Sequence, residues 1–125
     1  MEKKLLIVDD EAPIRMLLEQ SLEDLEDEGV ELLQASNGQE ALEMIQAERP
    51  GLVFLDVMMP LMNGLEVCRI VKKELKMEGV FIVLLTAKGQ DMDRQKGFDM
   101  GADEYLTKPF DPDALLSLAE EVLEV

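Results

Sequence analysis

Side chains suited to phosphoryl chemistry stand at the ends of four predicted strands. They are, in chain order, Asp9 with Asp10, Asp56, Thr86 and Lys108. The carboxyl ends of parallel strands lie along one rim of an open sheet, so residues far apart in the chain meet there. Carboxylates can hold a metal ion or attack phosphorus, whereas an ammonium and a hydroxyl can hold phosphoryl oxygens. The sequence therefore predicts one polar site on that rim.

Three of these side chains are carboxylates that repel one another at close range. Asp9 and Asp10 taken alone are also typical of a helix start, where the helix dipole favours acids. Asp56 has no such use, because it follows a fully apolar strand and Pro60 prevents an immediate helix. Clusters of carboxylate oxygens bind hard divalent cations, most commonly Mg²⁺ in cells. We therefore predict a magnesium site at these three aspartates.

The lysine after the fifth strand is placed to balance that charge. We expect the Lys108 ammonium to pair with Asp56 and, after phosphoryl transfer, with a phosphoryl oxygen. Pro109 follows directly, and the isomer of the bond between them is left open. Thr86 taken alone is an ordinary strand former, but beside the acids its hydroxyl is a candidate donor to the same phosphoryl group.

The elements that position these residues follow from hydrophobic periodicity. Strand-length apolar runs alternate with segments of helical period, as in repeated βαβ units. The pattern predicts strands near residues 4–8, 30–35, 51–55, 80–85 and 104–107. It predicts helices from residue 10 or 11 to Gly29, and over 37–48, 64–77, 90–100 and 111–125.

Right-handed crossovers on a five-stranded parallel sheet leave few topologies. We expect an α/β fold of flavodoxin-like, doubly wound type with strand order 2-1-3-4-5 and five helices, in one domain over residues 1–125. That order places strands 1, 3, 4 and 5, which carry the polar residues, side by side. We expect Leu17 of the first helix and Leu75 of the third to face the core. Segment 90–100 has a thin apolar face, so its helix is expected to be weakly held.

The composition restricts the partners. A formal net charge of −16 over 125 residues argues against direct binding to nucleic acid or to an anionic membrane surface. There is no run of about 18 uncharged apolar residues, so we expect a cytoplasmic protein with no membrane contact. The chain has no histidine, which removes the usual general base and leaves carboxylates, a metal and lysine for catalysis.

Four stretches in order resemble the receiver domain of two-component response regulators, of the single-domain chemotaxis type. They are LIVDDE at 6–11, LDVMMP at 55–60 followed by Asn63 and Gly64, LLTA at 84–87, and GADEYLTKPF at 101–110. The resemblance extends over the whole chain. Each stretch alone is weak evidence, but all four at the spacing of the family are highly specific.

The resemblance implies a role for each acid. Asp56 would be the phosphoacceptor, attacking a phosphohistidine on a sensor histidine kinase or a small donor such as acetyl phosphate. The cofactor would be Mg²⁺, held by Asp10, Asp56 and the backbone carbonyl of Met58, with Asp9 acting through a bound water.

The resemblance also implies a switch. Lys108, Thr86 and the Ala87 amide would hold the phosphoryl oxygens, and Thr86 would be drawn toward the phosphate while Tyr105 turns inward. Tyr105 taken alone is equally typical of a half-exposed strand aromatic. The face built by helix 90–100, strand 104–107 and helix 111–125 would then change its preference for a downstream protein target or output domain. Dimerisation on phosphorylation is left open, with a monomer expected at rest.

Two flanking positions vary within the resembled family and set how fast water removes the phosphate. Here they are Met58 and Lys88, neither of which has an acid or amide side chain. We expect Met58 to shield the path of the attacking water and to give a persistent acyl phosphate.

Three rival functions fit less well. A phosphatase of the haloacid dehalogenase type needs a second Asp two residues after its nucleophile, where this chain has Met58 after Asp56 and Glu11 after Asp9. A flavodoxin-like electron carrier needs a hydroxyl-rich phosphate loop where this chain has acids. A receiver-like docking module that never uses phosphate would not need the full set of site residues. We therefore predict a signalling switch that catalyses its own phosphorylation and dephosphorylation, not an enzyme acting on other substrates.

Overall fold

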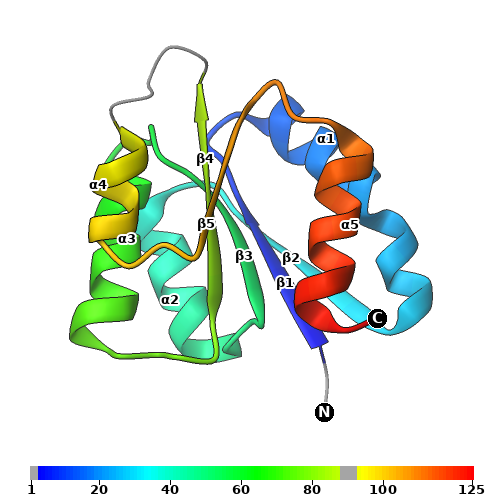
Figure 1. The fold of residues 1–125 in the computed structure, drawn as a ribbon, viewed down its shortest axis with the longest axis horizontal. Coiled ribbons are helices and arrows are strands. Elements are labelled where there is room, and N and C mark those ends of the chain that lie inside the picture. Colours follow the sequence, from blue (N-terminus) through cyan, green and yellow to red (C-terminus); the bar gives the residue numbers. More distant parts are fainter. Residues whose placement is uncertain (1–2, 88–92) are drawn as a thin grey trace.

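Five parallel strands form a central sheet in this computed structural model, which describes residues 3–87 and 93–125 (Figure 1). The strands are β1 (Lys3–Val8), β2 (Val30–Ala35), β3 (Leu52–Asp56), β4 (Phe81–Ala87) and β5 (Glu104–Lys108). Their order is β2-β1-β3-β4-β5, which confirms the predicted topology.

Helices cover both faces of the sheet. They are α1 (Ala12–Leu22), α2 (Gly38–Glu48), α3 (Gly64–Arg69), α4 (Asp93–Asp99) and α5 (Pro112–Leu123). Helices α1 and α5 lie on one side, and α2, α3 and α4 lie on the other (Figure 1). Within the described ranges, no helix has the length and hydropathy needed to cross a bilayer.

The central strand β3 is buried along its whole length. Its side chains alternate between the two faces, so Val53 and Leu55 belong to the core beneath α2 and α3, whereas Leu52 and Phe54 belong to the core beneath α1 and α5. Apolar strands of this kind are typical of a parallel sheet covered on both sides. Asp56, the last residue of this strand, is itself buried.

Two predicted helices end earlier than expected. Helix α1 stops at Leu22 and continues as a 3₁₀ turn over Glu23–Glu28, closed by Gly29 at φ 88°. Acidic side chains crowd this turn, and the negative end of a helix dipole disfavours them. Helix α3 stops at Arg69 and passes into a π-helical turn over Ile70–Glu74.

The prediction that Leu17 and Leu75 face the core is wrong, because they are 45% and 42% exposed. In α1 the buried residues are Leu18 and Leu22, one turn apart, which leaves Leu17 on the flank of the helix. Leu75 follows the π-helical turn, whose wider winding rotates later side chains away from the face that α3 buries.

Gly64 lies where α3 approaches β3 most closely. A Cβ atom at this position would lie 2.3 Å from the backbone oxygen of Asp56. The Gly64 amide donates to the Val57 carbonyl at 2.9 Å, and the Asn63 side chain caps the helix by accepting from the Glu66 amide at 2.9 Å. The start of α3 is thus packed directly against the backbone that carries Asp56.

Replacing Gly64 with Ala should therefore lower the free energy of unfolding by about 1 to 3 kcal/mol, because a methyl group must displace backbone. Gly79→Ala is the matched control, since its Cβ would meet no atom within 4 Å. Urea denaturation measures both. Equal stability of the two variants would show that α3 can shift at no cost.

Candidate functional site

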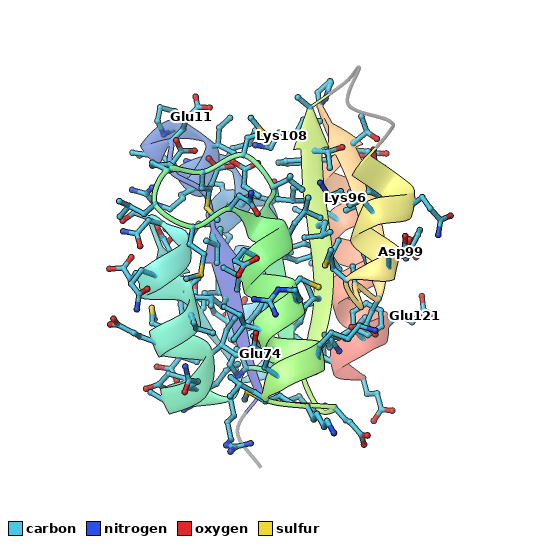
Figure 2. All side chains as sticks on the ribbon, turned by 90° about the vertical axis from the view of Figure 1, so that its left-hand side faces the viewer. Glu11, Glu74, Lys96, Asp99, Lys108 and Glu121 are labelled. Atoms are coloured by element: carbon cyan, nitrogen blue, oxygen red, sulfur yellow. The ribbon has the colours of Figure 1, made fainter. Side chains whose placement is uncertain are left out.

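The predicted site residues meet at the rim where the parallel strands end. Asp9 follows β1, Asp56 ends β3 and Lys108 ends β5. The register of the sheet pairs Ala87, the last residue of β4, with Lys108. Figure 2 shows Glu11 and Lys108 at the same end of the molecule. The edge strand β2 contributes none of the predicted residues.

Three carboxylates converge at this rim. Oxygen atoms of Asp9, Asp10 and Asp56 lie within 4.8 Å of one another. Asp9 is 0% exposed and Asp56 is 5% exposed, whereas Asp10 is exposed. The cluster therefore has two buried acids and one side open to solvent. Anionic oxygen ligands with access to water suit a hard divalent cation such as Mg²⁺.

Lys108 bridges the two buried acids. Its ammonium lies 2.8 Å from Asp9 Oδ2 and 3.3 Å from Asp56 Oδ1, so the expected pairing with Asp56 is accompanied by a closer one with Asp9. Asp9 Oδ1 accepts from the Glu11 amide at 2.9 Å, and the Asp9 carbonyl accepts from Arg15 Nη1 at 2.6 Å. Asp9 is thus fixed by hydrogen bonds to both its side chain and its backbone, and its contact with Lys108 keeps the ammonium at the rim.

The environment shifts the pKa of the two charged partners. Burial, and to a smaller extent the charge of Asp9, raise the pKa of Asp56, and the Lys108 ammonium opposes the rise; the net value is about 6. Burial acts to lower the pKa of Lys108, but its contacts with Asp9 and Asp56 raise it overall. Asp56 is therefore mostly ionised at neutral pH and faces a permanent cation.

Thr86 and Tyr105 form a buried polar pair beside the acids. Thr86 is 0% exposed, Tyr105 is 8% exposed, and Thr86 Oγ1 donates to the Tyr105 hydroxyl at 2.9 Å. The tyrosine thus lies inward and is not the half-exposed aromatic that its position alone also allowed. The pair connects the rim to β5.

The remaining predicted positions have different surroundings. Met58 is 59% exposed, two residues beyond Asp56. Lys88 lies outside the described residues. The bond between Lys108 and Pro109, whose isomer the sequence left open, is cis.

Sequence reasoning missed two features. One is the hydrogen bond from Arg15 to the Asp9 carbonyl, which no motif or spacing in the sequence indicates. The other is an apolar hollow beside Lys108, which Leu17 and Phe110 help to line. Hydrophobic periodicity assigns such residues to the core, so it does not distinguish buried core residues from residues that line a hollow open to solvent.

Comparison with known proteins agrees with this geometry. Residues 5–120 match the family model of the response regulator receiver domain. The probable transcriptional regulator ycf27 of Porphyra purpurea is 46% identical over 122 residues, covering 98% of this chain and 48% of the relative. The alkaline phosphatase synthesis transcriptional regulatory protein PhoP of Bacillus subtilis (strain 168) is 44% identical over 112 residues, covering 90% of this chain and 45% of the relative. The chain thus spans about half the length of these curated relatives.

Solved structures share both the fold and part of the sequence. A putative response regulator from Chloroflexus aurantiacus J-10-fl superposes with a TM-score of 0.86 at 33% identity, covering 100% of both chains. The Vibrio cholerae chemotaxis protein CheY4 superposes with a TM-score of 0.83 at 34% identity, covering 98% of this chain and 100% of that one. The chain therefore belongs to the response regulator receiver domain family of two-component systems.

Proposed function

We propose that Asp56 accepts a phosphoryl group from a phosphohistidine of a sensor histidine kinase and that the phosphorylated domain signals to a downstream protein target or output domain. Receiver domains interact with histidine kinases and output targets, and this chain is a receiver domain. The observation that carries the proposal is Asp56 itself. It is a 5% exposed carboxylate on a strand end, with two acids beside it and the Lys108 ammonium 3.3 Å away.

The chemistry needs no separate general base. Because the pKa of Asp56 is about 6, its carboxylate is deprotonated at neutral pH and can attack phosphorus directly. An O–P bond forms to Asp56 while the bond from phosphorus to the donor breaks, and the electron pair leaves with the donor. We assign the Lys108 ammonium, the Thr86 hydroxyl and the Ala87 amide to the phosphoryl oxygens.

The acids have the composition of a Mg²⁺ site. We propose Asp10, Asp56 and the Met58 carbonyl as its direct ligands, with Asp9 acting through water. When bound, Mg²⁺ supplies positive charge against the negative charge that gathers around the phosphoryl group. Lys108 supplies such charge from the protein side, and Asp9 keeps it in place through the 2.8 Å contact.

We further propose that the response to phosphorylation is an exchange of partners by Thr86. Its hydroxyl donates to Tyr105 in this structure, and a phosphoryl group on Asp56 would compete for that proton. Loss of the bond would remove this contact of Tyr105 on β5 and alter the face formed by α4, β5 and α5. Four further expectations stay predictions. They are a single domain over residues 1–125, a cytoplasmic location, the role of Lys88 and dimerisation on phosphorylation.

Acetyl phosphate with Mg²⁺ should add one phosphoryl group to the wild-type protein, detectable as an intact-mass increase. Asp56→Asn should abolish the increase, because the amide is not a nucleophile. Asp99→Asn, the same change at an exposed acid on α4, should label like the wild type.

Labelling of Asp56→Asn at the wild-type rate would place the acceptor elsewhere. An unlabelled wild type, with its fold verified by circular dichroism, would instead favour a docking module that does not use phosphate.

The exposed Met58 side chain bears on the lifetime of the acyl phosphate. Met58→Asn should shorten that lifetime several-fold, because an amide can orient the attacking water that methionine excludes. The measurement is loss of the phosphoryl mass after the donor is removed. A lifetime equal to or longer than that of the wild type would mean that Met58 does not shield the acceptor.

A further inference from the structure

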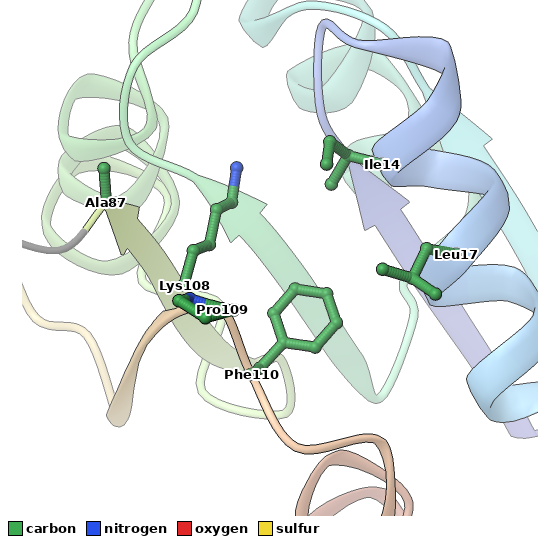
Figure 3. A pocket seen from close by; sticks show the side chains of 6 residues that line it. All are labelled: Ile14, Leu17, Ala87, Lys108, Pro109 and Phe110. Carbon is green, nitrogen blue, oxygen red and sulfur yellow. The ribbon is translucent and has the colours of Figure 1, made fainter.

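An apolar hollow opens directly beside the phosphoacceptor cluster, between α1 and the segment that joins β5 to α5. It encloses about 270 Å³ and is lined by Ile14, Leu17, Ala87, Lys108, Pro109 and Phe110. Figure 3 shows Lys108 and Pro109 on one side, Ile14 and Leu17 on the other, and the Phe110 ring between them. Small-molecule sites typically combine such apolar walls with very few polar groups.

The hollow exists because α1 buries only one stripe of its surface. Leu18 and Leu22 pack into the core, which leaves Leu17 45% exposed on the flank that faces Phe110. Leu17 therefore forms a wall of the hollow and does not contribute to the core. Covering hydrated apolar surface of this kind with an apolar group is favourable, because it removes that surface from water.

The same residues connect the hollow to the reactive site. The aliphatic stem of Lys108 lines the hollow, while its ammonium lies 2.8 Å from Asp9 and 3.3 Å from Asp56. Ala87, which pairs with Lys108 across the sheet, also lines it. A phosphoryl group held by the Lys108 ammonium thus has an apolar wall next to it.

We propose that this hollow receives the aliphatic group of a small acyl phosphate, so that donors with longer alkyl chains phosphorylate Asp56 faster than acetyl phosphate does. The choice of occupant follows from the lining: among the described residues that form it, the one charged group is Lys108 and none is a carboxylate. That lining matches a ligand with an anionic phosphate at one end and an alkyl chain at the other. This proposal rests on the proposed function of Asp56.

The transfer balances without an added reactant. A carboxylate oxygen of Asp56 forms a bond to phosphorus, and the bond between phosphorus and the acyl oxygen breaks. The electron pair stays on that oxygen, which leaves as the free carboxylate of the donor. No proton is taken up or released, so the alkyl group influences the rate only through binding.

The test compares butyryl phosphate with acetyl phosphate at equal, subsaturating concentrations, with Mg²⁺ present and initial labelling rates read by intact mass. Butyrate and acetate have nearly the same basicity, so the intrinsic reactivity of the donors is matched. The wild type should prefer butyryl phosphate by about tenfold, the size expected for burying two methylene groups.

Leu17→Gln should reduce that preference by about threefold or more, because it replaces one apolar wall. Met16→Gln is the matched control, since Met16 is 59% exposed on the same helix and does not line the hollow. Its preference should equal that of the wild type.

A wild-type rate ratio near one would overturn the proposal. A preference that Leu17→Gln leaves intact would overturn it as well, because the hollow would then not be its source. If neither donor labels the wild type, the proposed function of Asp56 fails and this proposal fails with it. Labelling by acetyl phosphate with no preference for butyryl phosphate would refute only the proposed role of the hollow.

Discussion

Repulsion among three carboxylates at a largely buried rim is the constraint on which this structure depends. Asp9 and Asp56 are almost fully removed from solvent, and oxygens of both lie within 4.8 Å of an oxygen of Asp10. Lys108 offsets part of this charge by contacting both buried acids. Because the lysine is 99 residues away from Asp9 in the chain, only the parallel sheet brings the two together. The fold is therefore the means by which an otherwise unfavourable cluster is assembled.

The surrounding elements each serve that cluster. The close contact of Gly64 with the Asp56 backbone sets the start of α3 against the strand that carries Asp56. On the other side, the buried hydrogen bond between Thr86 and Tyr105 links the rim to β5. The exposed flank of α1 adds an apolar wall beside the acids. One rim thus brings together the acid cluster, a buried polar pair that reaches β5 and an apolar hollow.

Much of the fold could be predicted because fully apolar runs such as β3 allow few placements, and the ends of those strands identified the acids and Lys108. What could not be predicted depends on side-chain direction and local winding. Leu17 and Leu75 fit a helical stripe in sequence, but the narrow contact of α1 and the π-helical turn after α3 expose them. The preference of Lys108 for Asp9 over Asp56 likewise follows from distances of 2.8 and 3.3 Å that no sequence spacing encodes.

The most direct test of this charge balance is the free energy of unfolding with and without Mg²⁺. The folded protein keeps the Asp56 proton up to a pKa of about 6, against an ordinary value of 3.8, so without metal this group costs stability as pH rises through that window. At a pH above 7, Mg²⁺ at tenfold to hundredfold its Kd should stabilise the wild type by about 1 to 3 kcal/mol. The gain should shrink below pH 6, where a proton competes with the cation, and should largely vanish in Asp10→Ala. An equal gain in the variant, or one independent of pH, would contradict the assignment of the cation to this cluster.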